Sequence, residues 1–257
     1  ASIQPLSVCS RASWPPVGEP VSGTMIFATV TAAGTLMILA VRMWPMTPGM
    51  ASPRILAYNT ITVPAIVDVP TGAVVTNDFA QITIDFELEW TALHRSQAPD
   101  LYPDHLRAEM DELMEDIYRD VNNGVYKAGF ATSQAAYEEA VIPLFDTLDW
   151  LEHRLARGRY LFGDRLTEAD WRLFTTLVRF DPVYVGHFKC NLRRIADYPN
   201  LMAYTRDLYQ HEGVAETVDM HHIKHHYYAS HDMINPTGVV PAGPILDLLA
   251  PHGRGAS

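Results

Sequence analysis

The chain has 257 residues, of which 48% are hydrophobic and 19% charged, a balance that excludes a disordered or collagen-like protein. This length allows two domains or one large one. The formal charge of −11 excludes a general nucleic-acid binder, because phosphate contacts require clustered lysine and arginine. Two cysteines, Cys9 and Cys190, cannot build a disulfide framework and indicate a reducing compartment, which we take to be the cytoplasm.

The first third of the chain has the composition of β structure. Residues 24–41 form a charge-free apolar run close to the length of a membrane span, but threonines and a glycine dilute it. We therefore expect a buried strand followed by a core element, and no membrane segment. Residues 61–69 and 73–78 flank a Pro-Thr-Gly turn, which predicts a strand, a turn and a second strand. Pro64 should be cis or lie at a sheet edge, because proline cannot donate to a central ladder.

Helical patterns dominate the remainder of the chain. Residues 79–90 fit a helix and a strand equally well, and both remain open. Apolar residues then recur at intervals of three and four from Leu106 to Val121, which predicts a long amphipathic helix. We expect this helix to end at 122–124, where Asn or Gly can adopt the left-handed conformation. A second helix of the same kind is predicted from about Ser133.

The sharpest local signal is the string LTEADW. Its Thr167 and Asp170 occupy the two positions of a capping box, which predicts the start of a helix. Proline lacks an N–H and crowds the preceding turn, so we expect this helix to break at Asp181-Pro182. The aromatic segment that follows, up to Cys190, is predicted to form the wall of a pocket.

The end of the chain contains one more helical signal and an irregular tail. Pro199 can occupy the first position of a helix whose buried side carries Leu201, Tyr204 and Leu208. The string INPTGVVPAGP is too rich in proline and glycine for regular structure, so the tail should lie over the surface.

Four longer strings are more specific: VNNGVYKAGFATSQAAYEEAV, LTEADWRLFTTLVRFDPVYVGHFKCNL, HIKHHYYASH and INPTGVVPAGP. They resemble the Xi class of glutathione transferases, the glutathionyl-hydroquinone reductases, in a match that runs from about Thr60 to Arg254. The resemblance implies an α/β thioredoxin-like N-terminal domain followed by an all-α glutathione-transferase C-terminal domain. We expect these domains at 1–92 and 93–231, with an irregular C-terminal extension at 232–257.

The resemblance also implies an activity and its residues. The family reduces glutathionyl-hydroquinones to hydroquinones through a cysteine–glutathione mixed disulfide, which a second glutathione resolves to glutathione disulfide. Cys9 in VCSRAS matches the attacking cysteine, although the string lacks the proline, tryptophan, histidine and arginine of the family motif. Tyr126 matches the proton donor, and Tyr184 and Tyr227 match tyrosines that lower the pKa of the cysteine. The residues implied to bind glutathione are Trp44, Val63, Pro64, Asp78 and Phe79.

Two departures from the family pattern keep other functions open. The altered cysteine string and Phe79, which replaces a hydrogen-bonding serine, allow a non-catalytic glutathione-transferase-like protein that binds ligands. The apolar run at 24–41 allows a structural subunit of a larger assembly. The family resemblance implies a homodimer, with glutathione and glutathionyl-hydroquinones as partners and neither nucleic acid nor membrane.

Two further groups are interpreted as structural. A cysteine among aromatic residues is most often a small buried hydrophobe, and we assign Cys190 that role. The four histidines of HHIKHH, residues 221–226, have the i, i+4 spacing of metal ligands. Nothing in the sequence completes such a site, so we expect a solvated helix end with Tyr227 turned inward, and no metal.

Overall fold

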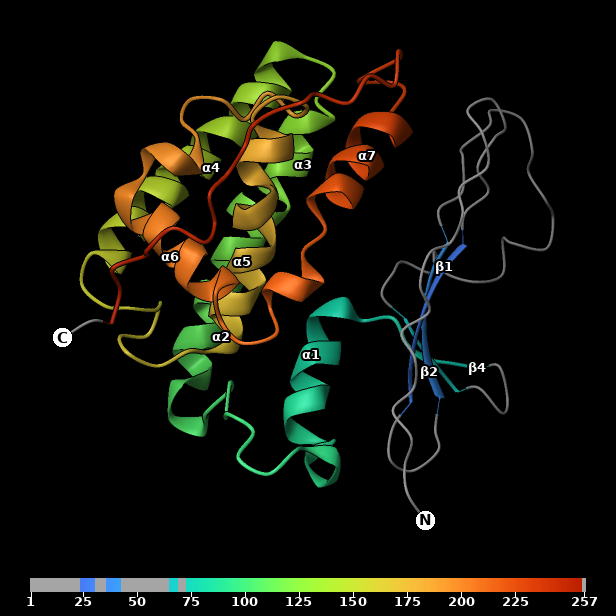
Figure 1. The fold of residues 1–257 in the computed structure, drawn as a ribbon, viewed down its shortest axis with the longest axis vertical. Helices are drawn as coiled ribbons and strands as arrows, with labels where there is room; N and C mark the ends of the chain where they lie inside the picture. Colours follow the sequence, from blue (N-terminus) through green and yellow to red (C-terminus); the bar gives the residue numbers. More distant parts are fainter. Residues whose placement is uncertain (1–23, 31–35, 43–64, 69–72, 256–257) are drawn as a thin grey trace. The chain divides into compact units, whose positions relative to one another are not determined.

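The computed structural model describes residues 24–30, 36–42, 65–68 and 73–255 (Figure 1). The chain divides into two compact units, Ala1–Gln97 and Ala98–Ser257, each of which is described by itself.

The first unit contains two antiparallel strand pairs. β1 (Thr24–Val30) pairs with β2 (Leu36–Arg42), so the apolar run at 24–41 forms two strands. β3 (Ile66–Asp68) pairs with β4 (Ala73–Thr76), which confirms the two predicted strands, whereas the predicted turn between them lies outside the described residues. The residues opposite one another at the ends of the first pair are Thr24 with Arg42 and Val30 with Leu36. Within the described residues, no helix is long and apolar enough to cross a membrane.

The ambiguous segment at 79–90 is a helix, α1 (Phe79–Leu88). Its N-cap is Asp78, whose carboxylate accepts a hydrogen bond from the Gln81 N–H at 3.3 Å. An N-cap of this kind satisfies a first-turn N–H that a helix otherwise leaves unpaired.

The second unit consists of helices and short turns. The α-helices are α2 (Arg107–Asp116), α3 (Gly124–Gly129), α4 (Gln134–Leu155), α5 (Glu168–Arg179), α6 (Pro199–Tyr209) and α7 (Met220–Ser230). Two π-helical turns cover Ile117–Asn122 and Phe180–Tyr184. Short 3₁₀ turns cover Thr91–Leu93 in the first unit and Asp104–Leu106, Ile195–Asp197 and Ala215–Thr217 in the second. The predicted helices beginning near Ser133 and at Pro199 are confirmed.

The expected left-handed end of the first long helix is wrong. Asn123 has a φ of −89°, and the chain passes through a π-helical turn directly into α3. The side chain of Asn122 donates to the Arg172 carbonyl at 3.0 Å and to the Thr176 hydroxyl at 2.6 Å, both on α5. These contacts with a distant helix hold the segment in a right-handed turn, which local sequence alone does not indicate.

α5 forms the core of the helical unit and packs against α2, α6 and both π-helical turns (Figure 1). Its residues Leu173 and Leu177 are 0% and 2% exposed. Burying a leucine stabilises a fold by about 1.5–3 kcal/mol, so this helix anchors the unit.

The predicted capping box at the start of α5 is confirmed. The buried Asp170 carboxylate accepts hydrogen bonds from the Thr167 N–H and hydroxyl, both at 2.8 Å. The Leu161 N–H donates to it at 2.9 Å and the Tyr204 hydroxyl at 2.8 Å. Burial raises the pKa of the Asp170 carboxyl, and these four hydrogen bonds oppose that shift. We refer to Asp170 and these three donor residues as the capping network.

The C-terminal segment crosses the helical unit without regular structure, as predicted (Figure 1). Gln210, the C-cap of α6, donates to the carbonyls of Leu248 and Ala250 at 2.8 and 2.9 Å. The Arg254 guanidinium donates to the carbonyls of Leu155 and Arg159, both at 2.8 Å. Arg254 therefore satisfies the carbonyl of Leu155, the last residue of α4, and one carbonyl of the segment that follows.

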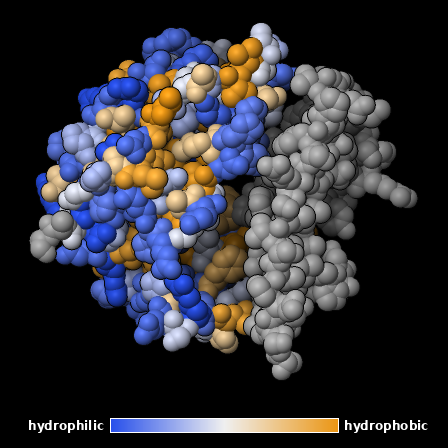
Figure 2. Space-filling model, in the orientation of Figure 1, coloured by the Kyte–Doolittle hydropathy of each residue, from blue (hydrophilic) through white to orange (hydrophobic). Residues whose placement is uncertain are grey.

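Hydrophobic and hydrophilic residues are interspersed over the visible face of the helical unit (Figure 2). Apolar residues scattered in this way are ordinary on a protein surface.

Candidate active site

Three tyrosines from separate elements of the helical unit lie together. Tyr126 lies in α3, Tyr184 ends the second π-helical turn and Tyr227 lies in α7. The Tyr227 hydroxyl is 2.5 Å from that of Tyr126 and 3.0 Å from that of Tyr184. We call these three residues the tyrosine cluster. Tyr227 is 6% exposed, in agreement with the prediction that it turns inward.

The tyrosine cluster has one exposed end and one buried end. Tyr184 is 2% exposed, whereas Tyr126 is 37% exposed. Burial, followed by the charge of the neighbouring phenols, raises the pKa of Tyr184 and Tyr227 well above the ordinary tyrosine value. These two hydroxyls therefore stay protonated at neutral pH.

The buried end fixes the direction of the hydrogen bonds. Among the described residues, the Tyr184 hydroxyl has Tyr227 as its hydrogen-bond partner. A buried hydroxyl must place its single proton on an acceptor, so Tyr184 donates to Tyr227. Tyr227 then donates to Tyr126, and the Tyr126 proton points away from the other two. In this arrangement the proton that is not used within the cluster belongs to Tyr126, its exposed residue.

The segment carrying Tyr184 is shaped by the proline predicted to break α5. The helix ends at Arg179, and the Val185 N–H bonds to the Phe180 carbonyl at 3.0 Å in the wider π-helical turn. The buried Asp181 carboxylate accepts from the Ile195 N–H at 2.6 Å and the Ala196 N–H at 3.0 Å. The turn is thus tied to the 3₁₀ turn before α6.

A pair of histidines joins the same segment to the end of α7. His187 Nε2 lies 3.0 Å from His231 Nδ1, at hydrogen-bond distance. Burial lowers the pKa of His187 to about 4, and the neighbouring His231 and Lys189 charges act in the same direction. Both imidazoles are neutral near pH 7, since burial also lowers the pKa of His231. Sequence reasoning missed this pair, although both residues lie within the quoted family strings.

Cys190 is the buried hydrophobe that the sequence indicated. It is 0% exposed, and its Sγ lies 3.9 Å from the Val125 carbonyl. Burial raises the pKa of its thiol to about 12. A thiol that stays protonated is a poor nucleophile, so Cys190 is unsuited to redox chemistry.

The remaining predicted site residues belong to the first unit. Asp78 and Phe79 meet at the start of α1, where Asp78 caps the helix and Phe79 is 44% exposed. The other predicted residues, Cys9, Trp44, Val63 and Pro64, lie outside the described residues.

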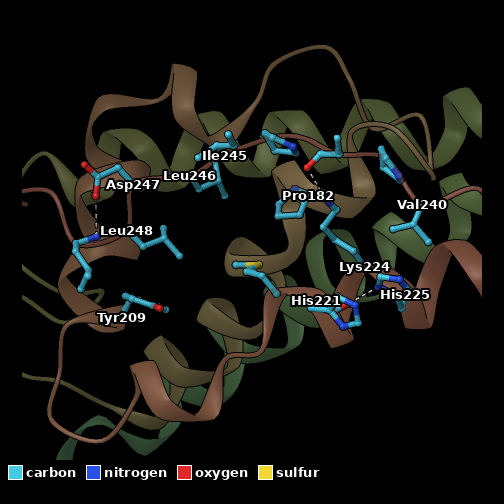
Figure 3. Close-up of a pocket in the computed structure, with 15 residues that line it drawn as sticks. Pro182, Tyr209, His221, Lys224, His225, Val240, Ile245, Leu246, Asp247 and Leu248 are labelled. Carbon is cyan, nitrogen blue, oxygen red and sulfur yellow. Dashed lines mark hydrogen bonds between the residues drawn. The ribbon is translucent and has the colours of Figure 1, made fainter. Parts of the chain in front are cut away.

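A cavity of about 630 Å³ lies between α7, Pro182 and the C-terminal segment (Figure 3). Lys224 donates to the Ala242 carbonyl at 2.9 Å, and the His225 ring bonds to the His221 carbonyl at 2.9 Å. These polar groups serve the protein's own carbonyls, whereas ligand sites present convergent polar groups. In the described part of the chain, no group of three His, Cys, Asp or Glu residues could hold a metal ion.

Comparison with known proteins identifies close relatives of both the sequence and the fold. Residues 134–207 match the family model "Glutathione S-transferase, C-terminal domain". The chain is 54% identical to glutathionyl-hydroquinone reductase YqjG of Escherichia coli K12, over 76% of this chain and 59% of that protein. It is 61% identical to glutathionyl-hydroquinone reductase PcpF of Sphingobium chlorophenolicum, over 56% of this chain and 46% of that protein.

Solved structures agree with these matches. The glutathione-bound structure of E. coli YqjG aligns with a TM-score of 0.74 at 53% identity, covering 77% of this chain and 64% of that one. A Xi-class glutathione transferase from Natrialba magadii aligns with a TM-score of 0.73 at 48% identity, covering 75% of this chain and 59% of that one. The resemblance to this family is thereby confirmed. The chain spans about half to two thirds of the length of these relatives.

Proposed function

We propose that this chain, which is similar to Xi-class glutathione transferases over three quarters of its length, reduces glutathionyl-hydroquinones at the expense of glutathione. The observation that supports this most strongly is the tyrosine cluster, a hydrogen-bonded chain of phenols that ends at the exposed residue Tyr126. The names of two curated relatives state the same activity for those proteins.

The proposed reaction needs one nucleophile and one proton donor. The Cys9 thiolate attacks the sulfur of the glutathionyl group, so that a sulfur–sulfur bond forms and the bond from sulfur to the ring carbon breaks. The electron pair left on that carbon takes a proton, and the hydroquinone leaves. A glutathione thiolate then attacks the mixed disulfide, which yields glutathione disulfide and restores the Cys9 thiolate.

We assign the proton transfer to Tyr126. Tyr126 is the exposed residue of the tyrosine cluster, and general acids must reach the atom they protonate. Hydrogen bonding to a phenolate oxygen stabilises it, and Tyr227 is placed to donate such a bond after Tyr126 loses its proton. Tyr184 in turn donates to Tyr227. Both buried tyrosines thus act on the reaction through Tyr126, whereas the resemblance associates them with the cysteine.

We propose that glutathione binds to the first unit. A thioredoxin-like domain at 1–92 would precede the helical domain at 93–231 and the extension at 232–257. Asp78 at the start of α1 supports this assignment, because a carboxylate there can pair with the ammonium group of glutathione. Phe79 has no hydrogen-bonding group, so it would contribute only apolar contact with glutathione. The residues proposed to complete the site are Trp44, Val63 and Pro64.

Two further properties follow from the family resemblance and stay proposals. We propose a homodimer, as the resemblance implies. We also propose the cytoplasm as the compartment, because the mechanism needs Cys9 as a free thiol and a supply of reduced glutathione.

The direct test compares the wild type with Cys9→Ser in an assay of hydroquinone release from a glutathionyl-hydroquinone, with glutathione supplied. We expect turnover by the wild type and loss of about a thousandfold or more in the variant, because a serine hydroxyl is far less ionised than a thiol. Equal activity in both would contradict the role of Cys9. Binding of the hydroquinone without turnover by the wild type would instead support the non-catalytic ligand-binding protein.

A further inference from the structure

Phe188 lies against all three residues of the tyrosine cluster. Its ring is nearly parallel to that of Tyr184, with centroids 5.5 Å apart and planes inclined by 16°. It meets Tyr126 edge to face at 5.4 Å and Tyr227 edge to face at 5.8 Å. Offset-parallel and edge-to-face arrangements are the geometries that aromatic pairs prefer. One apolar ring thus contacts the three phenols whose hydroxyl groups form the hydrogen-bond chain.

The surroundings of Phe188 hold its ring in place. The side chain is 0% exposed, and the His231 ring lies parallel to it within 11° at 5.9 Å. On α3, a Cβ added at Gly129 would lie 2.2 Å from the Phe188 ring, so glycine is needed there for the ring to fit. A backbone hydrogen bond also spans this residue. The Cys190 N–H, after Phe188 in the chain, donates to the Tyr184 carbonyl, before it, at 2.9 Å.

A left-handed residue follows the ring immediately. Lys189 has a φ of 61°, a conformation that costs a residue with a side chain on the order of 1 kcal/mol. Its carbonyl accepts a hydrogen bond from the Tyr137 hydroxyl at 2.6 Å. Strained backbone of this kind persists where surrounding contacts demand it, and Phe188 is the residue directly before it.

We propose that Phe188 is a positioning residue for the proton transfer, an inference that rests on the proposed function. The ring sets the separations of the three phenol oxygens, and carries no polar group that could compete for their hydrogen bonds. Removing it would leave the tyrosines present but free to shift. A misplacement of about 1 Å in a catalytic group can cost about a hundredfold in rate.

The test separates proton transfer from chemistry at sulfur. In Phe188→Leu we expect hydroquinone release to slow by about 10–100-fold. Formation of the Cys9–glutathione mixed disulfide from glutathione disulfide requires no protonation of carbon, so its rate should stay within about twofold of the wild type. The matched control is Phe174→Leu, which removes a buried ring on α5 outside the cluster. It should leave both rates unchanged.

A second variant covers the case in which Phe188→Leu fails to fold. Gly129→Ala keeps every aromatic side chain, but its Cβ forces the Phe188 ring to shift. It should produce the same selective loss of hydroquinone release. Wild-type rates in the variants that fold, or equal slowing of both reactions, would overturn the positioning role. Absence of hydroquinone release in the wild type would refute the proposed function instead.

Discussion

The helical unit contains two buried hydrogen-bond networks at opposite ends of α5, and they differ in one respect. In the capping network the Asp170 carboxylate is buried and accepts from Leu161, Thr167 and Tyr204. Every donor has its acceptor inside the protein. In the tyrosine cluster the chain of hydroxyls runs from the buried Tyr184 to Tyr126, which is 37% exposed. The first network is closed, and the second is open to a reacting molecule.

This contrast separates a stabilising network from a functional one. A fully satisfied buried network costs free energy when it is broken, but it has no group left to offer to a ligand. A chain of donors that ends at the surface can deliver one proton. Substitutions in the capping network should therefore change stability, whereas substitutions in the tyrosine cluster should change activity.

The largest effect is expected for Tyr126→Phe. Losing a general acid typically costs about 10²–10⁴-fold in rate. The substitution also removes the acceptor of the buried Tyr227 hydroxyl, so we expect a loss of about 1 kcal/mol in the free energy of unfolding. Hydroquinone release and thermal unfolding should be measured on the same protein. Tyr209→Phe, on α6 outside the cluster, is the control and should keep wild-type activity. Wild-type turnover in Tyr126→Phe would show that the tyrosine cluster does not supply the proton.

Asp170→Ala should show the opposite pattern. It leaves the buried N–H groups of Leu161 and Thr167 without an acceptor, which should lower the free energy of unfolding by about 3 kcal/mol. Urea unfolding measures this loss. The exposed Asp146 on α4 provides the control, because Asp146→Ala should change stability by less than about 0.5 kcal/mol. Equal stabilities of the two variants would show that the capping network is not a stabilising one.

Acid should weaken the link between the segment of Tyr184 and α7. The pKa of His187 is about 4 in the folded protein and about 6.5 in the unfolded one, so only the unfolded chain gains its proton between these values. The stability that neutral His187 contributes is fully present above pH 6.5 and is lost as the pH falls toward 4. We expect a loss of about 1–2 kcal/mol at pH 5. Denaturant unfolding should show a smaller loss in His187→Gln, whereas exposed His105→Gln should retain it. An unaltered profile in the first variant would contradict this account.

The smallest effect is expected at Lys189. Glycine adopts a φ of 61° without steric cost, but its unfolded chain has more conformational freedom. Relief of the backbone strain slightly exceeds the cost of the added freedom of the unfolded chain. Lys189→Gly should therefore raise the free energy of unfolding by about 0.5 kcal/mol and preserve turnover. Lys127→Gly inside α3 should lower it by about 1 kcal/mol. A destabilised Lys189→Gly would show that its backbone is not strained.

Local signals predicted the parts of the structure that local interactions determine. The capping box was recognisable because Thr167 and Asp170 lie three positions apart. The start of α6 was recognisable because proline favours the first position of a helix. The turn after Asn122 was not, because its side chain bonds to α5, some 50 positions away. Segment 79–90 was ambiguous from periodicity, and the Asp78 cap is consistent with its helical structure.

The candidate site depended on long-range information. Tyr126 and Tyr227 are 101 positions apart, and no spacing rule joins them. Only the family resemblance selected them from the other tyrosines of the chain. The role of Phe188 could not be predicted, because it depends on ring orientations and on the space left by Gly129.

The most direct test of the account is a single-turnover reaction. Protein is mixed with one equivalent of a glutathionyl-hydroquinone in the absence of free glutathione, and intact mass and released hydroquinone are followed together. The account predicts that the wild type gains one glutathione on Cys9 and releases an equal amount of hydroquinone, and that Tyr126→Phe slows this release by about a hundredfold or more. Release of hydroquinone without an adduct on Cys9, or equal release rates in the two proteins, would contradict it.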